Sequence, residues 1–144
     1  LDELQAAVLV IKLKHLDAWT RGRQTNAARY DELFRAADLG DAVRVPARVP
    51  GSRHIFNQYV LRVRQRDELR AHLAKNGVGT EIYYPVPLHA QRCFAYLEHD
   101  AADFPEAQRA AAEVLALPIY PELTAEQLEY VVRQIAAFFH SGGQ

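Results

Sequence analysis

The chain has 144 residues, of which 49% are hydrophobic and 24% are charged, as in an average soluble globular protein. With 17 basic and 18 acidic residues its net charge is −1, which argues against partners such as nucleic acid or an anionic membrane surface. A single cysteine, Cys93, excludes an internal disulfide and a cysteine metal cage, and favours a cytoplasmic location. No apolar run reaches the roughly 18 residues of a membrane-spanning helix.

Residues 1–37 show the apolar periodicity of helices, with leucines recurring at the i, i+4, i+7 spacing from Leu9. Between residues 6 and 11 the apolar side chains go right round the helix, which predicts burial on more than one side. Gly22 predicts a bend or break, so we assign 1–37 to connecting helices. The helical pattern is already present at the first residue and the chain contains no Met, which predicts a piece of a longer protein.

Residues 40–53 contain two prolines and two glycines, which predict a loop. The following segment, "HIFNQYVLRVR", alternates apolar and polar residues and predicts a half-buried strand. The side chains assigned to its buried face are Ile55, Tyr59, Leu61 and Val63.

A helix is predicted to begin near Asp67, where a carboxylate suits the helix dipole, and to end at Gly77, which favours a left-handed cap. The segment 79–84, "GTEIYY", predicts a second strand. Pro85 ends it, because proline cannot donate to a strand ladder.

In the last third of the chain, a short helix is predicted around 93–97 and a longer one from Pro105, through "EAQRAAAEVLA". Thr124 and Gln127 have the spacing of a capping box at the start of a final helix, and 141–144 is predicted to be a disordered tail. These elements predict an α+β fold, a small, mainly antiparallel sheet covered by helices, in one domain.

Catalytic chemistry is hard to find in this sequence. The six histidines lack metal-ligand spacing, and no nucleophile elbow or phosphate-binding glycine loop occurs. Cys93 lies among apolar residues and is predicted to be a buried structural thiol. The three lysines, Lys12, Lys14 and Lys75, lack the desolvated setting that a Schiff-base lysine needs. We therefore predict no catalytic, cofactor-binding or metal-binding residue.

The segment "TEIYYPVPLHAQ" is the one unusual feature. Its prolines hold the preceding residues extended, and strand alternation sends Tyr83 and Tyr84 to opposite faces. His89 stands at the start of the next helix. From the residues alone, the segment is either the rim of a ligand site or a turn that happens to be aromatic.

Four sequence blocks occur in a recognisable order: "LDELQAAVL" with "KLKHLDAW", "HIFNQYVLRV", "RDELRAHLAKNGVGTEIYYPVPLHAQ" and "EVLALPIYPELTAEQLEYVV". Together, over residues 1–139, they resemble the C-terminal part of the DegT/DnrJ/EryC1/StrS aminotransferases. These are pyridoxal-phosphate-dependent enzymes that act on nucleotide-linked keto sugars. The blocks "YYPVPLH" and "LALPIYPEL" look most like members that act at the 3-keto or 4-keto position.

The resemblance implies that 1–144 is the small C-terminal domain of a fold-type-I aminotransferase. It implies pyridoxal phosphate as the cofactor of the parent, glutamate and a nucleotide sugar as substrates, and a homodimer. In this family the cofactor lysine comes earlier in the chain, so the chain alone is expected to be inactive.

The resemblance assigns roles only to residues that would contact the substrate. The resemblance places Tyr83-Tyr84 where family members often carry a His-Tyr pair that approaches the substrate, and Tyr in the first place is a departure. Gln58 is assigned to strand packing with a local hydrogen bond. The predicted substrate-binding residues are Tyr83, Tyr84, His89 and His54.

Three interpretations of the chain remain open. The chain is either part of this enzyme or a non-catalytic ligand-binding or dimerisation module that shares the fold. A third possibility is a wholly structural interaction domain, in which the aromatic segment has no ligand.

Overall fold

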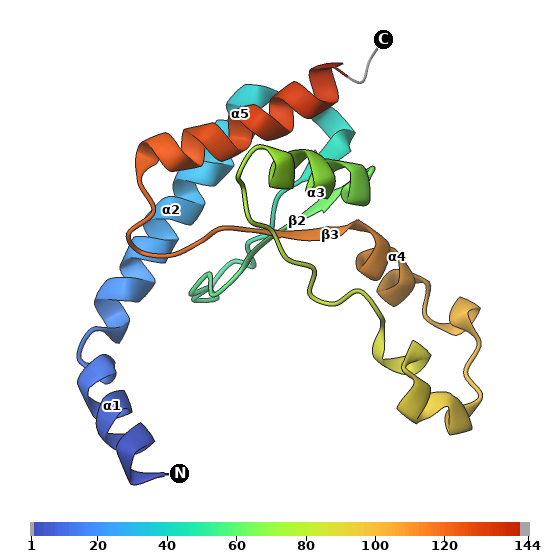
Figure 1. The fold of residues 1–144 in the computed structure, drawn as a ribbon, viewed down its shortest axis with the longest axis horizontal. Helices are drawn as coiled ribbons and strands as arrows, with labels where there is room; N and C mark the ends of the chain where they lie inside the picture. Colours follow the sequence, from blue (N-terminus) through green and yellow to red (C-terminus); the bar gives the residue numbers. More distant parts are fainter. Residues whose placement is uncertain (1, 142–144) are drawn as a thin grey trace.

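The computed structural model describes residues 2–141, in which a small three-stranded sheet packs against helices (Figure 1). Short 3-10 helices lie in the connections at Gly40–Ala42, Leu88–Ala90, Arg92–Leu97 and Ala101–Asp103. The α-helices and strands, in chain order within each class, are α1 (Glu3–Leu13), α2 (Leu16–Ala37), α3 (Arg66–Lys75), α4 (Pro105–Glu113), α5 (Ala125–Ser141), β1 (Val43–Arg44), β2 (Tyr59–Val63) and β3 (Val114–Leu117).

The sheet is antiparallel with the order β1-β2-β3, so β2 is its central strand. Val43 pairs with Val63 on one side of β2, and Tyr59 pairs with Leu117 on the other. Beyond β3 the sheet continues only as an isolated bridge between Glu81 and Ala116. The predicted α+β class with a small antiparallel sheet is confirmed.

The core lies between one face of the sheet and the helices α2, α3 and α5. Figure 1 shows α5 lying across α2, and α5 also contacts α3. Tyr59, Leu61 and Val63 alternate onto the covered face of β2, and they are buried. The burial predicted for Ile55 is wrong. This residue precedes the strand, and its side chain is 44% exposed.

Several local signals were read correctly. The helix predicted after Asp67 is α3, and Pro105 opens α4. Thr124 Oγ1 accepts a hydrogen bond from Gln127 N (3.3 Å), and Gln127 Oε1 accepts one from Thr124 N (2.9 Å), which confirms the capping box before α5. Ser141 is the last residue of α5, and the rest of the predicted tail, 142–144, lies outside the described residues.

The break predicted at Gly22 is wrong, because α2 runs through it. A Cβ at this position would lie 2.9 Å from the Pro121 Cβ, so glycine permits a close approach between α2 and the segment before α5. The helical pattern is interrupted earlier instead, between Lys14 and His15, where α1 ends and α2 begins.

The remaining sheet was assigned to the wrong segments. The helix predicted from Pro105 extends through Ala116, but α4 ends at Glu113 and β3 follows at once. Three of the four β3 residues are buried, so the strand has no polar alternation to distinguish it from a buried helical turn. The segment 79–84 forms a single bridge rather than a strand, and the loop 40–53 contains β1.

Helix α1 projects from the end of α2, away from the sheet (Figure 1). None of its residues is buried, and Leu9, for example, is 52% exposed. The burial predicted for residues 6–11 is therefore wrong for this chain, because no other element among residues 2–141 packs on this helix. No helix of residues 2–141 has the length and apolarity needed to cross a bilayer.

Residues 84–104, which we call the arm, leave the sheet and return to it through α4 (Figure 1). Most of the arm side chains are exposed, including Leu88 and Tyr96. Cys93 is exposed as well, so the predicted buried thiol is wrong. Its 3-10 helix has no second layer of residues to cover it, because the arm extends away from the core.

Candidate functional site

A groove of about 500 Å³ lies along the outer side of β3. We call it the edge groove. Its polar wall comes from two segments far apart in the sequence, and its floor comes from β3 and the residues after it. The polar side chains that line it are Asn57, Gln58, Thr80, Glu81 and Tyr83, and the floor is formed by residues 116–119.

Backbone pairing brings these two segments together. Tyr59, which follows Gln58 directly, pairs with Leu117, and this pairing fixes the polar residues at the entrance of β2. On the other side of β3, Glu81 N donates to Ala116 O (3.2 Å) and Ala116 N donates to Glu81 O (2.7 Å). The end of β3 is therefore held between the two segments, and side chains from both segments line the groove.

Tyr83 is the one predicted substrate-binding residue that lines the edge groove. Its side chain is 40% exposed. Tyr84 is 73% exposed and is not among the described residues that line the groove; its ring meets that of Tyr83 edge-on, with 5.8 Å between centroids. The two tyrosines thus form one aromatic unit, with the first directed to the groove.

His89 is held by the arm and α4. Its ring centroid lies 4.6 Å from that of Phe104, and its Nε2 lies 3.2 Å from Gln108 Nε2. A neutral imidazole can accept this hydrogen bond from the amide, so the contact orients the ring toward α4. The substrate-binding role of His89 stays a prediction.

His54 shapes the loop that precedes β2. Its Nδ1 accepts a hydrogen bond from Phe56 N (2.9 Å), and its ring lies 4.1 Å from the Phe56 ring. Its carbonyl accepts from Gln24 Nε2 on α2 (2.9 Å). His54 is exposed, and its own contacts are local, so its predicted role as a ligand residue also stays a prediction.

Four groove residues are not among the substrate-binding residues that the sequence predicts: Asn57, Gln58, Thr80 and Glu81. The side chains of these four form no hydrogen bond with another residue among 2–141, although Gln58 was assigned a local one. The polar pair directly before a half-buried strand was a usable signal. It points to a ligand wall only when the position of β3 is known.

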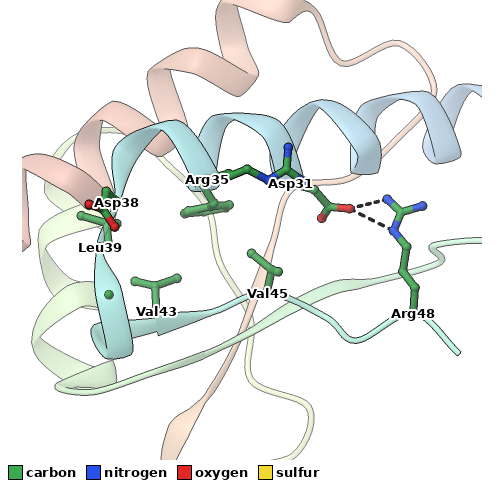
Figure 2. A pocket seen from close by; sticks show the side chains of 9 residues that line it. Asp31, Arg35, Asp38, Leu39, Val43, Val45 and Arg48 are labelled. Atoms are coloured by element: carbon green, nitrogen blue, oxygen red, sulfur yellow. Dashed lines mark hydrogen bonds and ion pairs between the residues drawn. The ribbon is translucent and has the colours of Figure 1, made fainter.

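A second hollow, of about 430 Å³, lies between the end of α2 and β1 (Figure 2). Figure 2 shows Asp31 and Arg48 pointing toward each other, and Arg48 Nε donates to Asp31 Oδ2 (2.9 Å). The other carboxylate oxygen accepts from the Tyr59 hydroxyl (2.7 Å). Burial, and then this hydrogen bond, raise the pKa of Tyr59 above its ordinary value. Both Asp31 oxygens are occupied, so we interpret the cluster as a structural tie between α2 and the loop before β2.

Metal and Schiff-base chemistry lack the necessary groups in the described part of the chain. Residues 2–141 contain no cluster of three or more His, Cys, Asp or Glu side chains that could hold a metal ion. Lys12, Lys14 and Lys75 are all exposed, which does not fit an amine that must be desolvated to bind an aldehyde cofactor. Among the described residues, the edge groove is lined by five polar side chains, of which Glu81 is the one that carries a charge.

The sequence and the fold of this chain were compared with those of known proteins. A sequence model of the DegT/DnrJ/EryC1/StrS aminotransferase family matches residues 1–136. The "Pleiotropic regulatory protein" of Geobacillus stearothermophilus is 49% identical over 139 residues, which are 96% of this chain and 37% of that protein. A Streptomyces venezuelae protein named "dTDP-3-amino-3,4,6-trideoxy-alpha-D-glucose transaminase" is 39% identical over 92% of this chain and 34% of its own length.

Solved structures agree with the sequence comparison. The crystal structure of S. venezuelae DesV in complex with a ketimine intermediate superposes with a TM-score of 0.90 at 36% identity, over 96% of this chain and 37% of that one. The chain thus spans little more than a third of the length of these relatives. Both the predicted resemblance and the predicted fold are confirmed, and the chain belongs to the DegT/DnrJ/EryC1/StrS aminotransferase family.

Proposed function

We propose that this chain is the C-terminal part of an aminotransferase that moves an amino group from glutamate to a nucleotide-linked keto sugar. The observation that carries the proposal is the family match over residues 1–136, together with relatives named as transaminases of dTDP-linked amino sugars. A homodimer, which the family resemblance implies, and a cytoplasmic location, which the single cysteine favours, belong to the same proposal.

Pyridoxal phosphate, the cofactor that the family implies, would supply the electron sink for amino transfer. This chain's own residues do not fit it. Its lysines are exposed on α1 and at the end of α3, without the burial that lowers an amine pKa. We therefore place the cofactor in a part of the parent outside this chain, and we expect the isolated chain to be inactive.

The contribution that we assign to this chain is a wall on the substrate side. Tyr83 supports this role, because it lines the edge groove and keeps its hydroxyl group free of hydrogen bonds to the described residues. Tyr84, His89 and His54 complete the proposed substrate-binding set, each from a position around the same end of the sheet or along the arm.

A labelling experiment tests the division of labour. The purified chain and the intact gene product are each mixed with pyridoxal phosphate, reduced with borohydride and weighed by mass spectrometry. We expect a stoichiometric pyridoxyl adduct on the intact product alone, together with amino transfer from glutamate to a dTDP-linked keto sugar. A stoichiometric adduct on a lysine of the isolated chain, or an intact product without transfer, would contradict the proposal.

A second candidate is a non-catalytic dimerisation module, and the exposed apolar surface of α1 favours it. The gene decides between the two. A reading frame that continues upstream into a lysine-bearing cofactor domain excludes the module, whereas a start codon directly before Leu1 supports it. A purely structural domain predicts that substitution of Tyr83, Tyr84 and His89 leaves the KM for the nucleotide sugar unchanged.

A further inference from the structure

The edge groove presents five polar side chains that have no hydrogen-bond partner among residues 2–141. Its two carboxamides, one hydroxyl, one phenol and one carboxylate form no side-chain hydrogen bond to any residue of the described range 2–141. Carboxamides and hydroxyl groups both donate and accept, whereas the carboxylate accepts only. A ligand with several hydroxyl groups, each able to donate and accept, matches this set.

The positions of these groups are fixed by backbone pairing. The two hydrogen bonds between Glu81 and Ala116 hold the backbone that carries the carboxylate. Asn57 and Gln58 directly precede Tyr59, which is fully buried and paired with Leu117. Ligand groups would therefore meet a prearranged wall, which reduces the entropy lost on binding.

The charge of the groove further limits the kind of ligand that it can bind. Glu81 is the only charged residue among those that line the edge groove, and no lysine, arginine or histidine is among them. A diphosphate would meet a like charge there and find no cation to pair with. The groove therefore suits an uncharged ligand and disfavours a phosphate group.

Shape points the same way. The floor is apolar where Leu117, Pro118 and Ile119 line it, and the half-exposed ring of Tyr83 stands at one side. A hexose ring has apolar C–H faces and a rim of hydroxyl groups, so it can pack on the aromatic ring and the floor while the rim meets the polar wall.

We propose that the edge groove binds the hexose ring of the nucleotide sugar, with Tyr83 packing against the ring. Asn57, Gln58 and Glu81 hydrogen-bond to the hydroxyl groups of the sugar and set its specificity, and the diphosphate lies outside the groove. This assignment rests on the proposed function and adds to it residues that the family resemblance did not supply.

The first test separates the two halves of the reaction in the intact gene product. We expect Asn57→Ala and Gln58→Ala to raise the KM for the keto sugar about 3- to 10-fold, and Glu81→Gln to raise it about 10-fold or more, because a charged acceptor is lost. The rate of the half-reaction with glutamate should stay unchanged in all three. Glu122→Gln and Gln134→Ala, outside the groove, serve as matched controls.

The second test measures binding without turnover. The affinity of dTDP-glucose is compared with that of dTDP, so that their ratio reports the contribution of the sugar. The ratio should fall in the groove variants while the affinity for dTDP stays constant. If Glu81→Gln instead tightens the binding of dTDP itself, the groove faces the diphosphate and the proposal is overturned.

The two proposals fail in different ways. A wild-type gene product that takes no amino group from glutamate refutes the proposed function. A wild-type enzyme that is active, with groove variants that keep both KM and the binding ratio, refutes the sugar site alone. Asn57→Asp keeps the side-chain shape and adds a negative charge, and it covers the case in which the alanine variant fails to fold.

Discussion

The core and the projecting parts of this molecule are both rich in apolar residues, yet they differ in what those residues contact. In the core, Tyr30, Leu61 and Ile135 are fully buried between the sheet and its helices. In α1 and the arm, large apolar side chains such as Leu13 and Leu88 are exposed. The apolar content of a segment therefore does not show whether the segment stabilises the fold. Its buried contacts do.

The same comparison separates folding from function. The described core supports the sheet that carries the edge groove, whereas the apolar surface of α1 contributes no buried side chain to it. The large apolar side chains of α1 are exposed to solvent in this chain and can associate with other apolar surfaces. We expect their substitution to change association and leave the free energy of unfolding nearly constant.

The largest difference should appear in a pair of leucine truncations. Leu61→Ala removes a fully buried side chain from the central strand and should lower the free energy of unfolding by about 2–5 kcal/mol. Leu9→Ala on α1 should change it by less than about 0.5 kcal/mol. Urea unfolding of the chain measures both, and equal effects would remove the distinction between the two regions.

Alkaline pH should destabilise the core through its buried phenols. Burial raises the pKa of both Tyr30 and Tyr59 above the ordinary value of about 10. Above that pH the unfolded state releases two protons that the folded state retains, so the free energy of unfolding falls by about 1.4 kcal/mol per pH unit for each tyrosine. Below pH 10 these groups contribute their full stability.

Unfolding titrations at pH values from about 9 to 11 test this slope, since the unfolded phenols titrate near 10. Tyr59→Phe should halve it, because it removes one of the two buried phenols. A stability that is flat over this range would show that the buried phenols do not control it.

The contact between α2 and the segment before α5 predicts an effect of intermediate size. Gly22→Ala gains about 1 kcal/mol in helix propensity but forces a Cβ to within 2.9 Å of the Pro121 Cβ. Overpacking of this kind costs about 1–3 kcal/mol, so we expect a net loss of up to about 2 kcal/mol. Gly79→Ala, where the added Cβ meets no atom within 4 Å, is the matched control. A stabilising Gly22→Ala would mean that the segment moves aside freely.

The smallest effect is expected at the start of α5. Thr124→Ala removes the acceptor for Gln127 N and should lower the free energy of unfolding by about 1 kcal/mol. Thr25→Ala, on the exposed surface of α2, removes the same group where no hydrogen bond to the described residues depends on it, and should stabilise the chain slightly through the higher helix propensity of alanine. Equal thermal unfolding temperatures for the two variants would contradict the capping role.

The helices could be predicted where a local signal defines them. The capping box at Thr124 and the proline at 105 act on the backbone of their own turn, so no knowledge of distant residues is needed. Strand β3 could not be predicted in this way. Its identity depends on pairing with β2 more than 50 residues earlier, as in the pair of Tyr59 and Leu117.

The residues of the candidate site likewise differ in whether a local sequence signal predicts them. Tyr83 is predicted because its motif resembles a family pattern, and in the structure it lines the edge groove. Asn57 and Glu81 were missed, because they come together only through the register of the sheet, and neither carries a local sign of its position. Gly22 was misread for a related reason: its role depends on Pro121, far away in the sequence.

Both borders of the sheet are unsuited to strand addition by another chain. β1 is only two residues long, and Pro46, which has no amide hydrogen, follows soon after it. At the opposite edge, the backbone amide and carbonyl of Ala116 are already hydrogen-bonded to Glu81, and Pro118 follows the end of the strand. At high concentration, we therefore expect copies of this chain to associate through exposed helical side chains. We do not expect them to form fibrils by strand addition.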